Sequence, residues 1–361
     1  MLICVSRTTE TQLLHSRWRF VIRRFFESEA WINKNNMDSY VEEDYQADYT
    51  DEECSDFNIE IVPHGEAKLK HSFHVAKPFF PFIIGSKNAV RKRIEIETKT
   101  SIQVPKPEQD GDIVIIGSDR RGILSARHRI DLIIEVSRKK LSYTHFLSIP
   151  LNTDEIIKNF NSFKSDVIQK FGGDITGINE IIFQKPIKLH LTIGMLTLLD
   201  EEERNQAVQT FMDCKQHIID PFIEKHGLFT LEIKGVQSMN DNPSAVKILY
   251  GIVFTENDIL QELFNQIVDY FAEKDLMPNR TKDVKLHVTF MNIAYRKKDN
   301  NVTIDKNIYK KFDATQILNE YKDTLFGKTV LKEIHLSQLK TATEVNYYQA
   351  TAKITLGEEQ P

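Results

Sequence analysis

The chain has 361 residues, 41% of them hydrophobic and 27% charged, with a formal net charge of −5. This length allows two or three domains, each with its own core, and no apolar run approaches the roughly 20 residues that a membrane-spanning helix needs. The three cysteines, Cys4, Cys54 and Cys214, are far apart, which argues against a disulfide framework or a zinc site and favours a reducing cytosol or nucleus.

The net charge is unevenly distributed along the chain. Residues 1–59 carry 6 Lys and Arg against 12 Asp and Glu, residues 60–140 carry 16 against 10, and residues 141–361 carry 25 against 30. A basic segment between two acidic ones indicates a polyanionic partner for the middle segment.

The N-terminal 59 residues have the composition of an extension rather than a domain. Residues 38–56 contain nine acidic and no basic side chains and little apolar periodicity. We therefore expect residues 1–59 to be a disordered acidic extension; a peptide that docks a partner is the alternative. The arginines among aromatic residues near the start could also form a weak amphipathic targeting segment, but Glu10, Glu27 and Glu29 count against it.

The basic segment, residues 60–140, predicts a small α+β domain. Its periodicity gives the order strand, helix, loop, helix, strand, strand, helix. The expected strands are residues 71–76, 101–105 and 112–117, and the expected helices are residues 78–85, 89–100 and 120–140.

Residues 143–356 alternate strands with helices and predict a second, larger α+β domain. A helix over residues 156–171 can be capped by Asn152 or Thr153, and acidic residues open another helix at residue 200. A third helix is expected over residues 259–274. The expected strands are residues 144–151, 188–195, 229–236, 246–254, 285–292, 333–339 and 347–356.

The most informative feature of the second domain is an internal repeat. KLHLTIGM at residues 188–195 and KLHVTFMN at residues 285–292 share the frame Lys-Leu-His-aliphatic-Thr-apolar, with their histidines 97 residues apart. One His-x-Thr triplet would be near the chance level in a chain of this length, whereas two in the same six-residue frame are not.

Strand alternation puts each histidine on the same face as its threonine. His190 and Thr192, and likewise His287 and Thr289, face one side, and the intervening apolar residues face the core. Two imidazoles can act as a proton donor and a proton acceptor on one phosphodiester, while the threonine hydroxyls donate hydrogen bonds to phosphate oxygens. A single strand histidine is more often a core residue, and His335, which lacks the Lys-Leu frame, is interpreted as structural.

The repeat resembles the 2H phosphoesterase superfamily, and the resemblance covers residues 143–356. It implies a two-lobed, pseudo-symmetric α/β fold in which His190 and His287 are the acid–base pair and Thr192 and Thr289 bind phosphate. Met239-Asn240-Asp241 and Tyr295-Arg296-Lys297 are similar to the A-kinase anchor protein subgroup. Arg296 and Lys297 could contact substrate phosphates; a solvated basic loop is the alternative.

Residues 82–105, FIIGSKNAVRKRIEIETKTSIQVP, resemble a type I KH domain, with the order βααββα. The resemblance implies a loop that clamps the sugar-phosphate chain of single-stranded RNA. Asn88 replaces the second glycine of the loop, but asparagine tolerates left-handed backbone better than most residues. A solvated basic helix face is the alternative. The RNA-binding residues implied by the resemblance are Ile84, Gly85, Ser86, Lys87, Asn88, Arg91 and Lys92.

A KH domain followed by a 2H domain is similar to a subunit family of the activating signal cointegrator 1 complex. The resemblance implies a nuclear location, with the cytoplasm as a second compartment, and a helicase and other complex subunits as partners in transcription coactivation and alkylation repair. We expect an RNA phosphodiesterase or cyclophosphodiesterase that needs no cofactor or metal. The alternatives are a non-catalytic RNA-binding scaffold and end-joining by the same site run in reverse.

Overall fold

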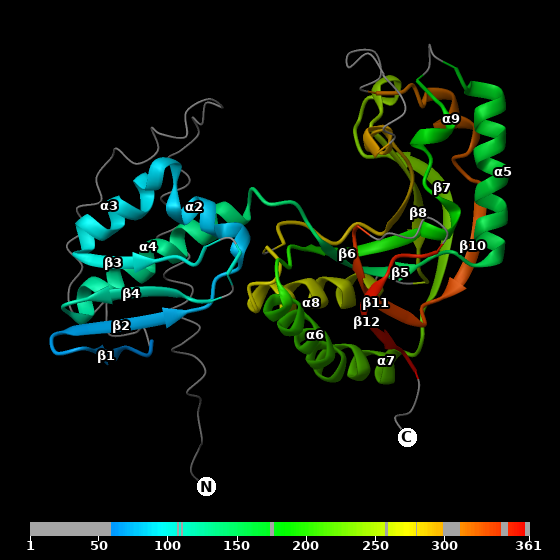
Figure 1. Cartoon of the computed structure of the whole chain (residues 1–361). Helices are drawn as coiled ribbons and strands as arrows, with labels where there is room; N and C mark the ends of the chain where they lie inside the picture. Colours follow the sequence, from blue (N-terminus) through cyan, green and yellow to red (C-terminus); the bar gives the residue numbers. More distant parts are fainter. Residues whose placement is uncertain are drawn as a thin grey trace, which may run out of the picture. The chain divides into compact units, whose positions relative to one another are not determined.

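The structure is a computed structural model that describes residues 59–106, 108–109, 111–173, 177–256, 259–278, 280–298, 311–340 and 346–357. Contacts divide the chain into two units, Met1–Asn58 and Ile59–Pro361. The first unit, including the acidic segment 38–56, lies outside the described residues. Figure 1 shows the elements of the second unit.

The KH segment folds as a four-stranded antiparallel sheet with helices packed on it. The strand order is β1-β2-β4-β3. Isoleucines at alternating positions of β4 and at helical spacing in α4 are buried together, which explains why these segments pair. The elements are β1 (Val62–His64), β2 (Lys68–Phe73), η1 (Lys77–Phe79), α2 (Phe80–Ile84), η2 (Ser86–Asn88), α3 (Ala89–Thr98), β3 (Thr100–Gln103), β4 (Ile113–Gly117) and α4 (Arg120–Arg138).

The predicted order of this segment is confirmed, with two corrections. The strand predicted at residues 71–76 is Lys68–Phe73, and the unpredicted β1 pairs with it through a turn at Gly65, whose φ is 72°. β1 has no buried residue, so hydrophobic periodicity could not reveal it.

The second segment contains an eight-stranded sheet in the order β10-β7-β8-β9-β6-β5-β11-β12. Each His-x-Thr motif lies on an inner strand, β6 or β9, and these two strands pair through Leu191 and Val288. The sheet therefore consists of two four-stranded halves. The strands are β5 (His145–Pro150), β6 (His190–Leu196), β7 (Thr230–Ser238), β8 (Ile248–Phe254), β9 (His287–Asn292), β10 (Leu325–Val330), β11 (Glu333–Gln338) and β12 (Ala350–Thr355).

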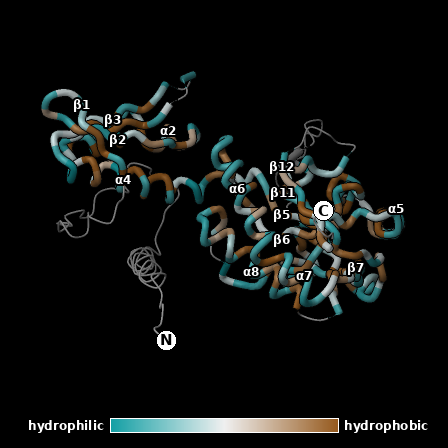
Figure 2. The backbone as a smooth tube through the Cα atoms, turned by 90° about the horizontal axis from the view of Figure 1, so that it is seen from below, coloured by the Kyte–Doolittle hydropathy of each residue, from teal (hydrophilic) through white to brown (hydrophobic). Residues whose placement is uncertain are grey.

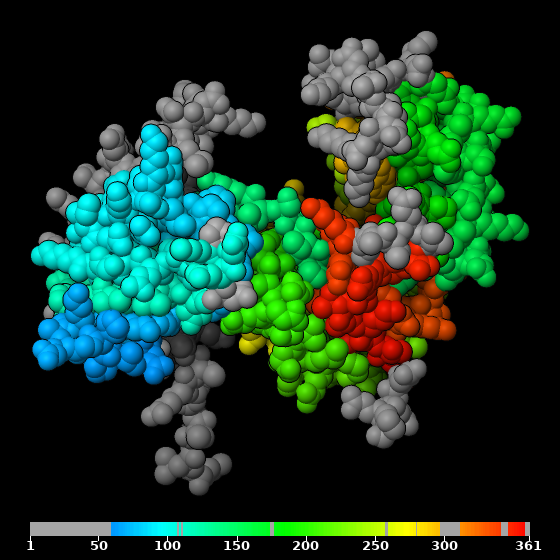
Figure 3. Space-filling model, viewed as in Figure 1, coloured from blue at the N-terminus to red at the C-terminus, as the bar shows by residue number. Residues whose placement is uncertain are grey.

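Two strand predictions need correction. β10 was not predicted, because Gly327 interrupts its pattern at a register shift. The strand predicted at residues 347–356 begins only at Ala350, so Tyr347 and Tyr348 lie outside it. β12 is an edge strand, and Figure 3 shows C-terminal residues, coloured red, at the surface.

The helices join the two half-sheets into one core. α5 follows β5 of the first half yet packs on β10 of the second, and α8 follows β8 of the second half yet packs on β6 of the first. Figure 1 shows α5 beside β7 and β10, and Figure 2 shows hydrophobic and hydrophilic positions alternating along α5. The helices are α5 (Asp154–Phe171), α6 (Glu201–Cys214), α7 (Asp220–His226), α8 (Ile259–Glu273) and α9 (Thr315–Glu320).

The helix starts differ in how they are capped. Asp200 caps α6 by accepting from the Glu203 backbone N–H at 2.9 Å, and three glutamates follow in the positive first turn. Thr153 occupies the N-cap position of α5 but makes no side-chain cap hydrogen bond, and the Asn152 amide donates to the Ile187 carbonyl instead. The predicted side-chain cap of α5 is therefore wrong.

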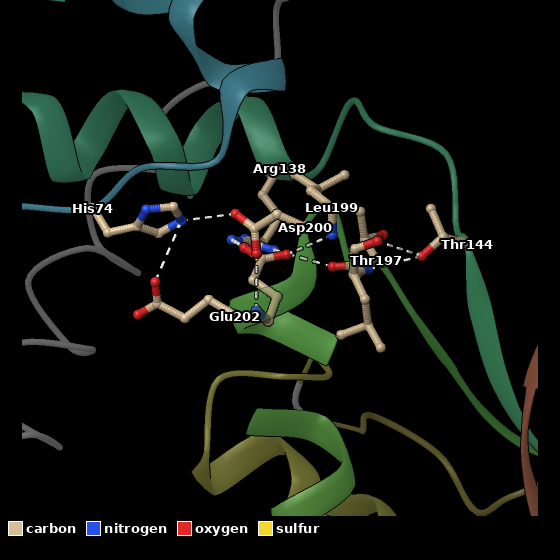
Figure 4. Close-up of polar contacts among 9 residues, drawn as sticks. His74, Arg138, Thr144, Thr197, Leu199, Asp200 and Glu202 are labelled. Atoms are coloured by element: carbon tan, nitrogen blue, oxygen red, sulfur yellow. Dashed lines mark hydrogen bonds and ion pairs between the residues drawn. The ribbon is translucent and has the colours of Figure 1, made fainter. Parts of the chain in front are cut away.

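The start of α6 also makes ion pairs with residues of the KH segment (Figure 4). His74 Nε2 lies 2.8 Å from Asp200 Oδ2, and Arg138 contacts Glu203 at 2.5 Å. The hydrogen bond with Asp200 raises the pKa of His74. Within the described part of the chain, none of the helices is long and apolar enough to cross a membrane.

Candidate active site

The two His-x-Thr motifs meet in a crosswise arrangement. β6 and β9 are antiparallel, and Leu191 pairs with Val288. Continuing this register by one residue in each direction places His190 opposite Thr289 and Thr192 opposite His287. Each threonine therefore lies across from the histidine of the other motif.

The predicted alternation of the two strands is confirmed. His190, Thr192, His287 and Thr289 are partly exposed on one face. The intervening residues of both strands are in the core; they are Leu189, Leu191, Ile193, Val288 and Phe290. Because one face of both strands is buried, the pairing register of the strands is fixed, and so are the positions of the side chains on the other face.

The lysine of the repeated frame has a structural role in both halves. His190 Nδ1–H donates to the Lys188 carbonyl at 2.7 Å, and His287 Nδ1–H donates to the Lys285 carbonyl at 2.8 Å. Because a carbonyl only accepts, Nδ1 carries the proton, and Nε2 is the basic atom of each neutral imidazole.

Each imidazole also packs against a tyrosine ring, and a lysine ammonium lies over that ring. The Tyr348 ring packs edge-on to His190 with centroids 5.2 Å apart, and Lys188 Nζ lies 4.9 Å from the Tyr348 centroid. The Tyr250 ring packs edge-on to His287 at 5.4 Å, and Lys285 Nζ lies 4.4 Å from that ring. The frame residue Lys thus has the same two contacts in each half.

Burial makes both histidines weaker bases than usual. It lowers the pKa of His190 to about 4, against the opposing effect of the Lys188 carbonyl, and a charged His287 lowers it further. Burial also lowers the pKa of His287, and the Lys285 ammonium adds to this effect. At neutral pH both imidazoles are therefore neutral in the free protein.

Of the two basic residues that were predicted to contact phosphate, the structure describes the side chain of Arg296. Arg296 is only 7% exposed, and its guanidinium donates to the Gly177 carbonyl, so it holds a loop. The phosphate contact of Arg296 stays a prediction. The side chain of Lys297 lies outside the described residues.

The loop of the KH segment has left-handed backbone at several positions. Gly85 has φ 69° and ψ 174°, and a Cβ there would lie 2.4 Å from Val90 Cγ2, so only glycine fits. Asn88 is left-handed with φ 66°, as its residue type allows, and Lys87 is left-handed with φ 52°. Asn88 therefore has left-handed backbone at the position where the second glycine was expected.

The other residues predicted to bind RNA differ in exposure. Ser86, Lys87 and Lys92 are exposed, whereas Ile84 is partly buried and packs on the KH core. Arg91 and Glu95 are both partly buried, and Arg91 Nε lies 3.9 Å from Glu95 Oε2. The loop and the start of α3 thus present cations to solvent.

Sequence reasoning missed two residues that contact the histidines, Tyr250 and Tyr348. They come from β8 and from the segment before β12, so no local motif connects them with His-x-Thr. His335, interpreted as structural, is 3% exposed, and its Nε2 lies 2.7 Å from Glu333 Oε2. Among the described residues, no three His, Cys, Asp or Glu side chains are grouped as metal ligands.

Two family models match the chain. Residues 70–132 match the KH domain, and residues 143–356 match the AKAP7 2'5' RNA ligase-like domain. These matches agree with the observed α+β architecture of a KH fold followed by a two-lobed phosphoesterase-like fold.

Proteins similar to this chain match either most of it or part of it. Activating signal cointegrator 1 complex subunit 1 of Mus musculus is 36% identical over 87% of this chain and 91% of its own length. A-kinase anchor protein 7 isoform gamma of Homo sapiens is 26% identical over 62% of this chain and 60% of its own. A solved phosphoesterase structure aligns with 60% of this chain and 100% of its own, at 15% identity and a TM-score of 0.39.

Proposed function

The chain belongs to the family of activating signal cointegrator 1 complex subunit 1, and from this premise we propose that it is an RNA-binding phosphodiesterase. The KH loop binds single-stranded RNA, and His190 and His287 act as an acid–base pair on an RNA phosphodiester or cyclic phosphate. The observation that carries the proposal is the crosswise pairing of two His-x-Thr motifs through Leu191 and Val288.

The geometry supports a division of roles within the site. One neutral imidazole takes a proton at Nε2 from the attacking hydroxyl or water. The other, protonated once the phosphate anion is bound, gives its Nε2 proton to the leaving oxygen. Thr192 and Thr289 donate hydrogen bonds to the non-bridging oxygens from opposite sides. Both Nδ1–H groups stay on backbone carbonyls throughout, which keeps the two Nε2 atoms directed at the substrate.

Family membership supports a role within a larger assembly. The relative's name identifies a subunit of the activating signal cointegrator 1 complex. We propose that this chain joins such a complex in the nucleus, with a helicase and other subunits as partners. Co-purification of the tagged chain from nuclear extract tests this, and recovery of the chain free of other subunits would contradict it.

A non-catalytic RNA-binding scaffold is the second candidate function. It is favoured by one observation, the lowered pKa of both histidines, which leaves the free protein without a charged imidazole to act as an acid. A bound phosphate anion offsets this, because its negative charge stabilises the protonated form of a neighbouring imidazole.

The deciding experiment measures turnover by the purified full chain in EDTA. The substrates are an oligonucleotide with a 2′,3′-cyclic phosphate and oligonucleotides with 2′-5′ or 3′-5′ linkages. His190→Ala and His287→Ala should each lower turnover by ~10²–10⁴. His217→Ala, which changes an exposed histidine, is the matched control. Turnover that both site variants retain excludes the acid–base roles, and no turnover by the wild type favours the scaffold.

RNA binding is tested separately. Lys87→Glu and Arg91→Glu should each weaken binding of single-stranded RNA by ~10-fold or more, because a cation near the phosphates becomes an anion. Lys140→Glu makes the same charge change at an exposed position beyond α4 and is the matched control. Equal binding by all three variants would exclude the KH loop as the RNA site.

A further inference from the structure

Ser148 of β5 holds the place in the first half of the sheet that Tyr250 of β8 holds in the second. Each residue pairs with the threonine of its own half, Ser148 with Thr192 and Tyr250 with Thr289. In both strands the pairing register shifts immediately before this residue. Because directly opposite residues of neighbouring strands point to the same face, Ser148 and Tyr250 are equivalent positions beside the two motifs.

A serine cannot supply the aromatic ring that Tyr250 places against His287. In the first half, the ring against His190 comes instead from Tyr348, which precedes the first residue of β12. Tyr250 is fixed within β8, and its hydroxyl also donates to Gln237 Oε1 of β7 at 2.8 Å. Since Tyr348 lies outside the strand, side-chain contacts have to hold its ring in place.

Tyr347, the residue before Tyr348, provides an anchor of this kind. Its hydroxyl donates to Ser148 Oγ at 3.0 Å, and Ser148 Oγ lies 3.0 Å from Ser337 Oγ of β11. Both serines are fully buried, so their hydroxyls must find partners inside the protein. The Tyr347 ring also packs edge-on to His335, with centroids 5.6 Å apart. Tyr347 is therefore held both at its hydroxyl and at its ring.

The anchored ring contacts the ring that packs on His190. The rings of Tyr347 and Tyr348 are edge-on with centroids 5.3 Å apart, and those of Tyr348 and His190 are edge-on at 5.2 Å. On the other side of Tyr348, the carbonyl of the next residue accepts from the Gln338 backbone N–H at 2.8 Å. The chain is thus held on both sides of Tyr348.

We propose that Tyr347 is a positioning residue that anchors Tyr348 against His190, with the Ser148 hydroxyl as its point of attachment. The proposal rests on the proposed function only in treating His190 as catalytic. The two histidines are then supported differently. A residue of a paired strand packs on His287, whereas the ring on His190 depends on a hydrogen bond between two side chains.

NMR titration of both histidines in the full chain tests this difference. Tyr347→Phe removes only the hydroxyl, and Ser148→Ala removes its partner. Either change should free the Tyr348 ring, let water reach His190 and raise the pKa of His190 by about one unit. His287 should titrate as in the wild type and serves as an internal control. His287, whose charge acts on His190, and Lys188, whose ammonium lies over Tyr348, are kept in all variants.

Tyr321→Phe is the matched control for the loss of a tyrosine hydroxyl. The Tyr321 hydroxyl donates to Asp166, and its ring packs edge-on to Phe163 of α5. This variant should leave the titration of His190 unchanged. If Ser148→Ala does not fold, Tyr347→Phe still decides the question, because it keeps the ring and removes one hydrogen bond. A His190 titration that Tyr347→Phe leaves unaltered overturns the proposal.

A double variant shows whether Tyr347 acts through Tyr348. Tyr348→Ala removes the ring itself and should also raise the pKa of His190. Adding Tyr347→Phe to Tyr348→Ala should then raise it no further, because the anchor has nothing left to hold. Shifts that simply add would mean that Tyr347 acts on His190 by another route and would refute the anchor.

Kinetics provide a second readout that a merely structural role would not move. In Tyr347→Phe, kcat should fall by ~10-fold with KM within about twofold, and the low-pH limb of kcat should move in step with the NMR titration. If the wild type cleaves none of the oligonucleotides but the titration moves in the variants, the proposed function fails and the positioning role stands. If the wild type is active and the titration stays fixed, the positioning role fails alone.

Discussion

Leu191 and Val288 pair across the junction of the two half-sheets, so the pseudo-twofold axis of the site passes between them. Both side chains are fully buried, and their neighbours in each strand point to the opposite face. The pair therefore sets the crosswise order in which each histidine faces the threonine of the other motif.

This order predicts that the two threonines contribute equally to kcat/KM. Thr192→Val and Thr289→Val keep the shape of the side chain and remove the hydroxyl, so each should lower kcat/KM by ~10²-fold through loss of a phosphate donor. Thr192→Ser and Thr289→Ser retain the hydroxyl, so their kcat/KM should stay within about threefold of the wild-type value. Steady-state kinetics on the best oligonucleotide check this, and a loss confined to one threonine would refute the symmetric arrangement.

The lowered pKa of His190 predicts a loss of stability on acidification. An unfolded histidine titrates near 6.5, whereas His190 in the folded chain titrates at about 4. Between these values the unfolded chain binds more protons, so the contribution of His190 is complete above about pH 6.5 and is lost as the pH falls to 4. It amounts to at most about 3 kcal/mol.

Urea unfolding between pH 4 and 7.5 measures this contribution. Other histidines with lowered pKa values, such as His145 and His335, also weaken the fold in acid. The difference between wild type and His190→Asn isolates His190, because asparagine does not titrate. The free energy of unfolding should fall less steeply with acid in the variant, and parallel curves would contradict the low pKa.

Because both imidazoles are neutral in the free protein, binding of an anion should take up a proton. A non-hydrolysable phosphodiester analogue placed between His190 and His287 stabilises the charged form of one of them. Calorimetry near pH 7 in buffers of different ionisation enthalpy should give uptake approaching about one proton. His287→Asn should reduce this uptake, and binding without any uptake would mean that no acid forms.

Gly85 should tolerate substitution less well than Gly65. Both have positive φ, 69° and 72°, but a Cβ at Gly85 meets Val90 Cγ2 at 2.4 Å, whereas nothing lies within 4 Å at Gly65. Gly65→Ala should therefore cost about 1 kcal/mol from backbone strain alone, and Gly85→Ala should cost more and weaken RNA binding. Urea unfolding and RNA titration compare the two, and equal costs would contradict the steric role of Val90.

Substitution of Phe290 tests whether the two half-sheets unfold in a single transition. This residue of β9 is fully buried against Phe160 and Phe163 of α5 and Phe326 of β10. Phe290→Ala should cost about 3–5 kcal/mol by leaving a cavity between elements of both halves. The unfolding transition of residues 143–356 should shift as a whole, since α5 comes from the first half; two separate transitions would show that the halves are independent.

Several features of the fold and site could be predicted because they depend on local periodicity. Alternation along residues 188–195 and 285–292 places His and Thr together on any strand with one buried face, and this was confirmed. The left-handed conformation of Asn88 followed from its residue type. Periodicity did not predict β1, because none of its residues is buried. It did not predict β10, because the register shifts at Gly327.

What the sequence by itself determined is therefore the pair of His-x-Thr strands and the KH loop, whose signals lie within a few adjacent residues. Only the tertiary structure decided that His190 faces Thr289 and that Tyr348 packs on His190. These contacts join residues more than 90 positions apart, and they arise from antiparallel pairing and from the burial of polar groups that must find partners. Likewise, only the tertiary structure showed that the basic side chain of Arg296 lies inside the fold and holds Gly177.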